Sequence, residues 1–140
     1  MSRVLRTDDR PMAGEPPVAE QARWTLEDAG YLLLRAGTGL LFLCHGLQKL
    51  FGLFGGVNGG AVPLASRFGV AGVLELVGGL LLLIGFFTRP VALVLAGEMV
   101  VASVTAHLPR GPVPIVNGGE IALLYFLIFV FLALTPRSTD

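Results

Sequence analysis

Four hydrophobic stretches make up more than half of this 140-residue chain, and each of them carries at least one ionisable side chain. A segment of about 20 apolar residues is long enough to cross the hydrocarbon core of a bilayer. A charged side chain near the centre of such a segment costs about 2.5 to 3.5 kcal/mol on insertion scales. It should therefore face the protein interior and either pair with another polar group or have a functional role. The residues concerned are Arg35, His45, Lys49, Glu75, Glu98 and Glu120.

The composition supports an integral membrane protein. Hydrophobic residues make up 54% of the chain and charged residues only 14%, and the mean hydropathy is +0.75. Soluble domains contain about 25% charged residues. The formal net charge is zero, which gives no reason to expect nucleic acid as a partner. We therefore predict an all-α, membrane-spanning antiparallel four-helix bundle in contact with the lipid bilayer.

The sequence divides into two tails and one transmembrane domain. Residues 1–28 lack the apolar core of a cleavable signal peptide and are expected to form a flexible polar tail. Residues 136–140 form a short second tail. Thr25 and Asp28 match a capping-box pattern at the start of the first apolar run. Within the domain 29–135, the predicted spans are 29–50, 70–87, 90–107 and 117–134.

The distribution of Lys and Arg gives a modest bias in orientation. Both termini and the turn at 88–90 lie on the side with more basic residues, which favours a cytoplasmic location for both termini. We expect a multi-pass protein of a bacterial-type cytoplasmic (inner) membrane.

The second predicted helix places small and acidic residues on one face. Gly72, Glu75 and Gly79 are spaced i, i+3 and i+7, and Gly78 lies beside them. Small residues permit close approach of helices in membranes, so this face should point into the bundle and carry Glu75 with it.

Polar residues of all four helices should converge beneath the two longer loops. Estimated depths along the helices place seven side chains in that half of the bundle, which we predict to be a ligand-binding site. They are His45, Gln48, Lys49, Glu75, His107, Asn117 and Glu120. Glu75 and Glu120 are the candidate catalytic carboxylates. A metal site is not favoured, although His45, His107, Glu75 and Glu120 carry suitable ligand atoms.

In the other half of the bundle, Arg35 and Glu98 lie roughly 10 and about 12 Å from the terminal ends of their helices. These similar depths predict a structural ion pair between them.

The aromatic residues of the last helix, including Tyr125 and Phe129, point all round it and are interpreted as lipid contacts. Cys44 is the only cysteine, so this chain alone provides no disulfide or CxxC redox pair.

The chain resembles the DoxX family of small four-helix membrane proteins over about residues 31–135. The resemblance rests on three stretches in this order: LRAGTGLLFLCHGLQKLFG at 34–52, GVLELVGGLLLLIGFFTRP at 72–90 and NGGEIALLYF at 117–126. The family takes its name from a membrane subunit of a thiosulfate:quinone oxidoreductase, and members have been linked to redox and thiol-stress complexes. The resemblance therefore implies a fold and a redox setting.

Three functional hypotheses follow. The leading one is a redox-associated membrane subunit, at most one subunit of a quinone-linked oxidoreductase, whose polar cluster binds a quinone or another small ligand and which works with a soluble or membrane redox partner. The second is a non-enzymatic scaffold or assembly factor for soluble redox enzymes. The third is a small-solute or proton-coupled carrier. The glycine-rich helix face is equally suited to packing within the bundle and to packing in a homo-oligomer.

Overall fold

The computed structural model describes residues 24–135 and 137, so most of both predicted tails lies outside the described residues. The first helix, α2, covers Leu26–Phe51 and begins where the sequence predicts a capping box. The Thr25 hydroxyl accepts a hydrogen bond from the Asp28 amide at 3.2 Å, and the Asp28 carboxylate accepts one from the Thr25 amide at 2.9 Å. This reciprocal pair confirms the predicted cap and satisfies amides that a helix start leaves unbonded.

The remaining elements follow in chain order. A short 3-10 turn, η1 (Leu53–Gly55), leads through an irregular loop to α3 (Arg67–Ile84). Helix α4 (Thr88–Ala102) continues directly into a π-helical turn, η2 (Ser103–His107), and a 3-10 turn, η3 (Leu108–Arg110). A single turn, α5 (Pro114–Asn117), precedes the last helix, α6 (Glu120–Leu134).

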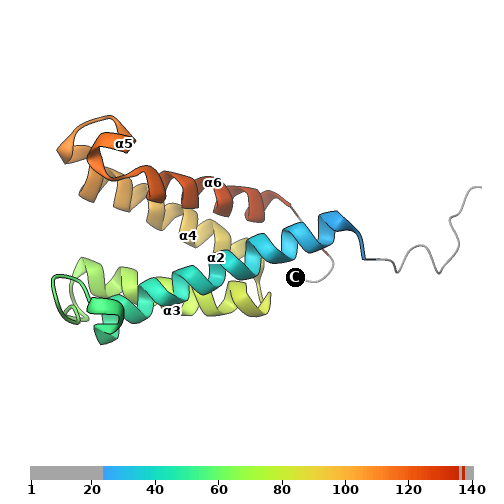
Figure 1. The fold of residues 1–140 in the computed structure, drawn as a ribbon, viewed down its shortest axis with the longest axis horizontal. Helices are drawn as coiled ribbons and strands as arrows, with labels where there is room; N and C mark the ends of the chain where they lie inside the picture. Colours follow the sequence, from blue (N-terminus) through green and yellow to red (C-terminus); the bar gives the residue numbers. More distant parts are fainter. Residues whose placement is uncertain (1–23, 136, 138–140) are drawn as a thin grey trace, which may run out of the picture.

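The long helices form an antiparallel bundle built from two pairs. Helix α2 packs along α3, and α4 packs along α6 (Figure 1). The two pairs lie close together at the end where α2 begins and α6 ends, which we call the terminal end, and they diverge toward the end that carries the two longer loops, which we call the loop end (Figure 1). The structure confirms the predicted all-α bundle.

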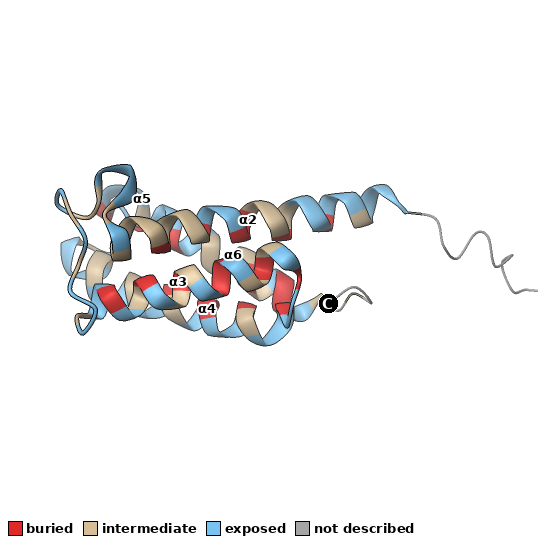
Figure 2. Ribbon diagram, turned by 90° about the horizontal axis from the view of Figure 1, so that it is seen from below, coloured by how far each residue is buried: buried red, intermediate tan, exposed pale blue. Residues whose placement is uncertain are grey.

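Length and apolar composition qualify three helical segments as membrane spans. They are Leu26–Phe51, Arg67–Ile84 and Thr88–Arg110, the last including the π and 3-10 turns. Helix α6 is apolar but has only 15 residues. Exposed residues line the outward faces of the helices (Figure 2), and many of them have large hydrophobic side chains, as expected for a surface solvated by lipid.

Helices α2 and α3 approach so closely that only glycine fits at several positions. A Cβ atom added to Gly39 would lie 2.6 Å from the Leu83 amide nitrogen, and one added to Gly46 would lie 2.5 Å from the Leu76 nitrogen. On α3, Gly72 and Gly79 are buried against α2. The predicted inward face of the second helix is thus confirmed.

The second pair, α4 and α6, buries both large and small side chains. Phe129 and Leu132 of α6 are fully buried, as are Ala92 and Leu95 of α4. Phe42 of α2 meets Phe129 edge-on with ring centroids 4.7 Å apart, which links the two pairs. The burial of Phe129 contradicts our interpretation of the α6 aromatic residues as lipid contacts.

Several helix ends differ by about three residues from the predicted spans. Helices α2 and α3 begin at Leu26 and Arg67 rather than at 29 and 70. Helix α3 ends at Ile84 rather than near 87, because Gly85 adopts a left-handed conformation with φ of 77° that terminates the helix. Helix α6 begins at Glu120 rather than 117, because Gly118, with φ of 76°, breaks the chain direction after the short α5.

At the terminal end, two arginine side chains link the ends of different helices. Arg137 forms an ion pair with Asp28, and its guanidinium lies over the Tyr31 ring, 5.1 Å from the centroid. Arg89 donates a hydrogen bond from Nε to the Ala133 carbonyl at 3.1 Å, which satisfies one of the carbonyls left open at the end of α6. The start of α2 and the end of α6 therefore lie on the same side of the bundle.

We predict that Gly39→Ala destabilises the protein by about 1 to 3 kcal/mol or more, because its methyl group would force α2 away from the α3 backbone. Gly37→Ala, two residues away on the same helix, provides the matched control, since a Cβ there meets nothing within 4 Å. Size-exclusion chromatography after heating in detergent should show a lower midpoint for Gly39→Ala only. Equal midpoints for the two variants would argue against the close helix contact.

Candidate functional site

A cavity of about 420 Å³ lies between the two helix pairs at the loop end. Residues of α2, α3, α4, η2 and α6 line it, so its walls exist only in the assembled bundle. The lining is mainly apolar, and Phe42, Met99 and Ala122 form part of it. Its volume falls within the range of about 300 to 1,000 Å³ that small-molecule sites occupy. The cavity is therefore the candidate binding site.

An ion pair between α2 and α3 forms one polar wall. The Lys49 ammonium contacts both oxygens of Glu75, at 2.7 and 2.6 Å. Both side chains are largely shielded, with exposed fractions of 15% for Lys49 and 7% for Glu75. The pair arises because Gly72, one turn from Glu75, lets the Lys49 stem pack against the α3 backbone.

A second carboxyl group, Glu98 of α4, lines the same cavity. Its Oε2 atom is buried and makes no hydrogen bond within the part of the chain that the structure describes. Buried polar atoms are nearly always bonded, so an exception inside a cavity points to a ligand.

Aromatic side chains form the third part of the lining. His45 of α2 lies edge-on to Tyr125 of α6, with ring centroids 6.2 Å apart and planes at 87°. Phe42 contacts both rings, at 6.1 Å from His45 and 4.7 Å from Tyr125. The cavity thus brings an imidazole and a phenol together, each of which can donate or accept a hydrogen bond.

The loop end of the cavity is shaped by the π-helical turn. Thr105, Ala106 and His107 line the cavity from η2. Single π-helical turns within α-helices occur frequently at functional sites, since the wider turn redirects side chains. The His107 Nδ1 atom lies 3.3 Å from the Asn117 carbonyl oxygen, which ties η2 to the following loop.

Asn117 has a structural role. Its side-chain amide donates to the Gly111 carbonyl at 2.6 Å, and its side-chain oxygen accepts from the Gly119 amide at 2.7 Å. Asn117 is buried and fixes the connection between η3 and α6 rather than facing the cavity.

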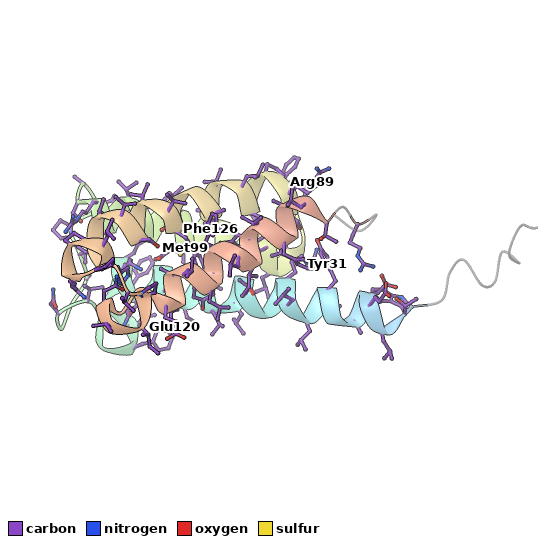
Figure 3. The ribbon with its side chains drawn as sticks, turned by 90° about the horizontal axis from the view of Figure 1, so that it is seen from above. Tyr31, Arg89, Met99, Glu120 and Phe126 are labelled. Carbon is purple, nitrogen blue, oxygen red and sulfur yellow. The ribbon has the colours of Figure 1, made fainter. Side chains whose placement is uncertain are left out.

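Of the seven predicted binding residues, the structure brings together four: His45, Lys49, Glu75 and His107. Gln48 and Asn117 are absent from the cavity lining. Glu120 is exposed at the start of α6, at the opposite end of the bundle from Tyr31 and Arg89 (Figure 3). Since α6 begins at Glu120, this carboxylate lies at the helix end rather than inside the bundle.

The candidate metal ligands are likewise not assembled. Among the described residues, no group of three or more His, Cys, Asp or Glu side chains is arranged to hold a metal ion. The outward position of Glu120 removes one of the four candidates from the cavity.

The predicted ion pair between Arg35 and Glu98 is not formed within the described part of the chain. The Arg35 guanidinium packs against Gly85, level with the turn between α3 and α4. Helix α2 projects beyond the start of α4 at the terminal end (Figure 1). Because the depth estimate assumed that the two helices start level, it misplaced Glu98, which lies about 15 Å along α4.

Sequence reasoning missed several lining residues. Tyr125, Met99, Arg67 and Thr105 all line the cavity. Tyr125 precedes Phe129 by one helical turn, on the side of the loop end. A prediction that Phe129 is a core residue would therefore have placed Tyr125 on the same inward face of the helix.

The sequence matches a known protein family. The model of the DoxX family matches residues 30–108, more than half of the chain. The chain belongs to the DoxX family. This match covers most of α2 and all of α3, α4 and η2, and therefore most of the residues that line the cavity.

Two relatives of similar size extend the comparison. A Haemophilus influenzae protein named only as uncharacterized is 39% identical over 102 residues, covering 70% of this chain and 76% of the relative. A Bacillus subtilis protein named "Putative oxidoreductase CatD" is 36% identical over 110 residues, covering 77% of this chain and 80% of the relative. No solved structure matches the chain.

The lining of this DoxX-family cavity suits a particular kind of ligand. Its apolar walls accommodate a hydrophobic body, while His45, Tyr125 and Glu98 provide hydrogen-bonding groups for a polar end. The exposed side chains of Phe68, Val101 and Ile121 continue the lining to the bundle surface. A ligand that arrives from the bilayer meets apolar surface before it reaches the polar groups.

We predict that Lys49→Met destabilises the protein by about 3 to 5 kcal/mol, because it leaves the Glu75 carboxylate buried without its cation. The double variant Lys49→Met/Glu75→Met should recover most of this loss, since replacing both partners of a buried pair with apolar residues is often neutral. Thermal unfolding midpoints in detergent measure both effects. If the single and double variants lose stability equally, the ion pair is not what matters at this position.

Proposed function

We propose that this protein is a membrane subunit of a quinone-linked oxidoreductase and that its cavity binds the head group of a lipophilic quinone. The observation that carries the proposal is the combination, in one cavity within a membrane-spanning bundle, of apolar walls with hydrogen-bonding side chains from four helices. A lipid-soluble ligand with a polar head matches both kinds of surface.

The residues present fit such a head group. Quinone carbonyl oxygens accept hydrogen bonds, and His45 and Tyr125 supply potential donors from α2 and α6. Lys49 is held by Glu75, but an ammonium group has three N–H donors, so one more acceptor can be bound. The exposed apolar residues that continue the lining, Phe68, Val101 and Ile121, would contact an isoprenoid tail.

The proposal also needs a partner. Reduction of a quinone to the quinol takes up two electrons and two protons, and Cys44, the one cysteine in the sequence, provides no dithiol to supply the electrons. We therefore propose a second protein, soluble or membrane-bound, as the electron donor. The name of the Bacillus subtilis relative supports an oxidoreductase setting.

Filling the cavity tests the binding site directly. We predict that Ala106→Phe weakens binding of decylubiquinone at least tenfold, since the larger ring would occupy cavity volume. Leu124→Phe, on the exposed face of α6, is the matched control and should bind like wild type. Titration of purified protein in detergent, with native mass spectrometry to count bound ligand, measures the effect. Wild-type protein that binds no quinone would refute the proposal.

We further propose that the protein resides in a bacterial cytoplasmic membrane with both termini in the cytoplasm. The start of α2 and the end of α6 lie on the same side of the bundle, which supports the same compartment for both termini. The distribution of basic residues favours the cytoplasm as that compartment. We predict that fusions of a cytoplasm-active fluorescent protein to either end fluoresce, whereas alkaline phosphatase fusions to either end remain inactive. An active phosphatase at either terminus would contradict this orientation.

A further inference from the structure

The two cations that face the cavity with Glu98 both contact other groups. From α2 the cavity receives Lys49 and His45, from α3 Glu75 and Arg67, from η2 His107, and from α6 the Tyr125 phenol. Lys49 already binds both oxygens of Glu75. Arg67 is exposed, and its guanidinium lies over the Phe68 ring, 5.1 Å from the centroid. Each of these two cations is therefore held by another group.

Glu98 is partly buried and forms no ion pair with a described residue. Its Oε2 atom is buried and accepts no hydrogen bond from a described residue. An ionised carboxylate buried without a partner is so costly that such a group normally binds a proton instead. The neutral acid has an O–H group, which needs an acceptor, and the adjacent cavity is where a ligand would supply one.

We propose that Glu98 is a specificity-determining residue of the cavity: as a neutral carboxylic acid, it donates a hydrogen bond to a carbonyl oxygen of the ligand. This inference rests on the proposed quinone function and narrows it. The cavity then selects uncharged, carbonyl-bearing rings with apolar tails. An ionised Glu98 would have the opposite preference and would bind an amphiphilic amine.

The distinction between donor and charge determines the choice of variants. Glu98→Gln keeps an N–H donor of nearly the same shape without any ability to ionise, whereas Glu98→Leu removes the donor and keeps the volume. Glu120→Gln serves as the control, because Glu120 is exposed and outside the cavity. The two probes are decylubiquinone and dodecyldimethylamine, which pair similar tails with a neutral carbonyl head and a cationic head.

We expect decylubiquinone to bind wild type, Glu120→Gln and Glu98→Gln with affinities within about threefold, and Glu98→Leu about tenfold or more weakly. Dodecyldimethylamine should bind all four proteins weakly and equally. Tight amine binding that is lost in Glu98→Gln would overturn the inference, since it would require an ionised carboxylate. Unchanged quinone binding by Glu98→Leu would overturn it while leaving the proposed function intact. Absence of quinone binding by wild type would refute both.

Infrared spectroscopy provides a readout that does not depend on ligand affinity or on the Leu variant. The wild-type spectrum should contain a carbonyl band of a protonated carboxylic acid that is missing from Glu98→Gln. A spectrum in which the variant instead loses a carboxylate band would overturn the inference.

Discussion

The close approach of α2 and α3 is the contact on which the rest of the bundle depends. Gly39, Gly46 and Gly72 remove the side-chain layer that normally separates two helices, so the backbones themselves are in contact. This contact fixes the antiparallel register, and the register in turn places Lys49 opposite Glu75. In lipid, where apolar surface gives helices little reason to associate, such packing and the buried ion pair support each other.

The second helix pair packs differently from the first. Helices α4 and α6 bury large side chains such as Phe129 and Leu132 together with alanines such as Ala92 and Ala96. Leu95 of α4 packs on Gly78 of α3 and so joins the two pairs. The pairs lie close together near the terminal end and separate toward the loop end, where the polar side chains of the cavity gather (Figure 1).

The sequence was sufficient for features that depend on one helix at a time. The capping box at Thr25 and the inward face of Gly72 and Glu75 follow from spacing alone, and the structure agrees with both. Contacts between side chains of different helices were harder to predict from the sequence. Arg35 and Glu98 were matched by depth, but a projecting α2 start shifts one helix relative to the other, and nothing in the sequence reports that offset. Tyr125 was missed because an apolar helix buried on one side and lipid-facing on the other shows no periodic contrast.

The brevity of α6 has a consequence for the surrounding membrane. Its 15 residues span about 22 Å, less than the roughly 30 Å of a typical hydrocarbon core. Lipids beside this helix must thin or tilt to match it, at a cost of fractions of a kcal/mol per Å. The exposed Ile115 and Val116 of α5 offer apolar contact at the same boundary. We expect the bilayer to thin on the flank of the bundle beside the cavity and the protein to partition toward thinner membrane regions.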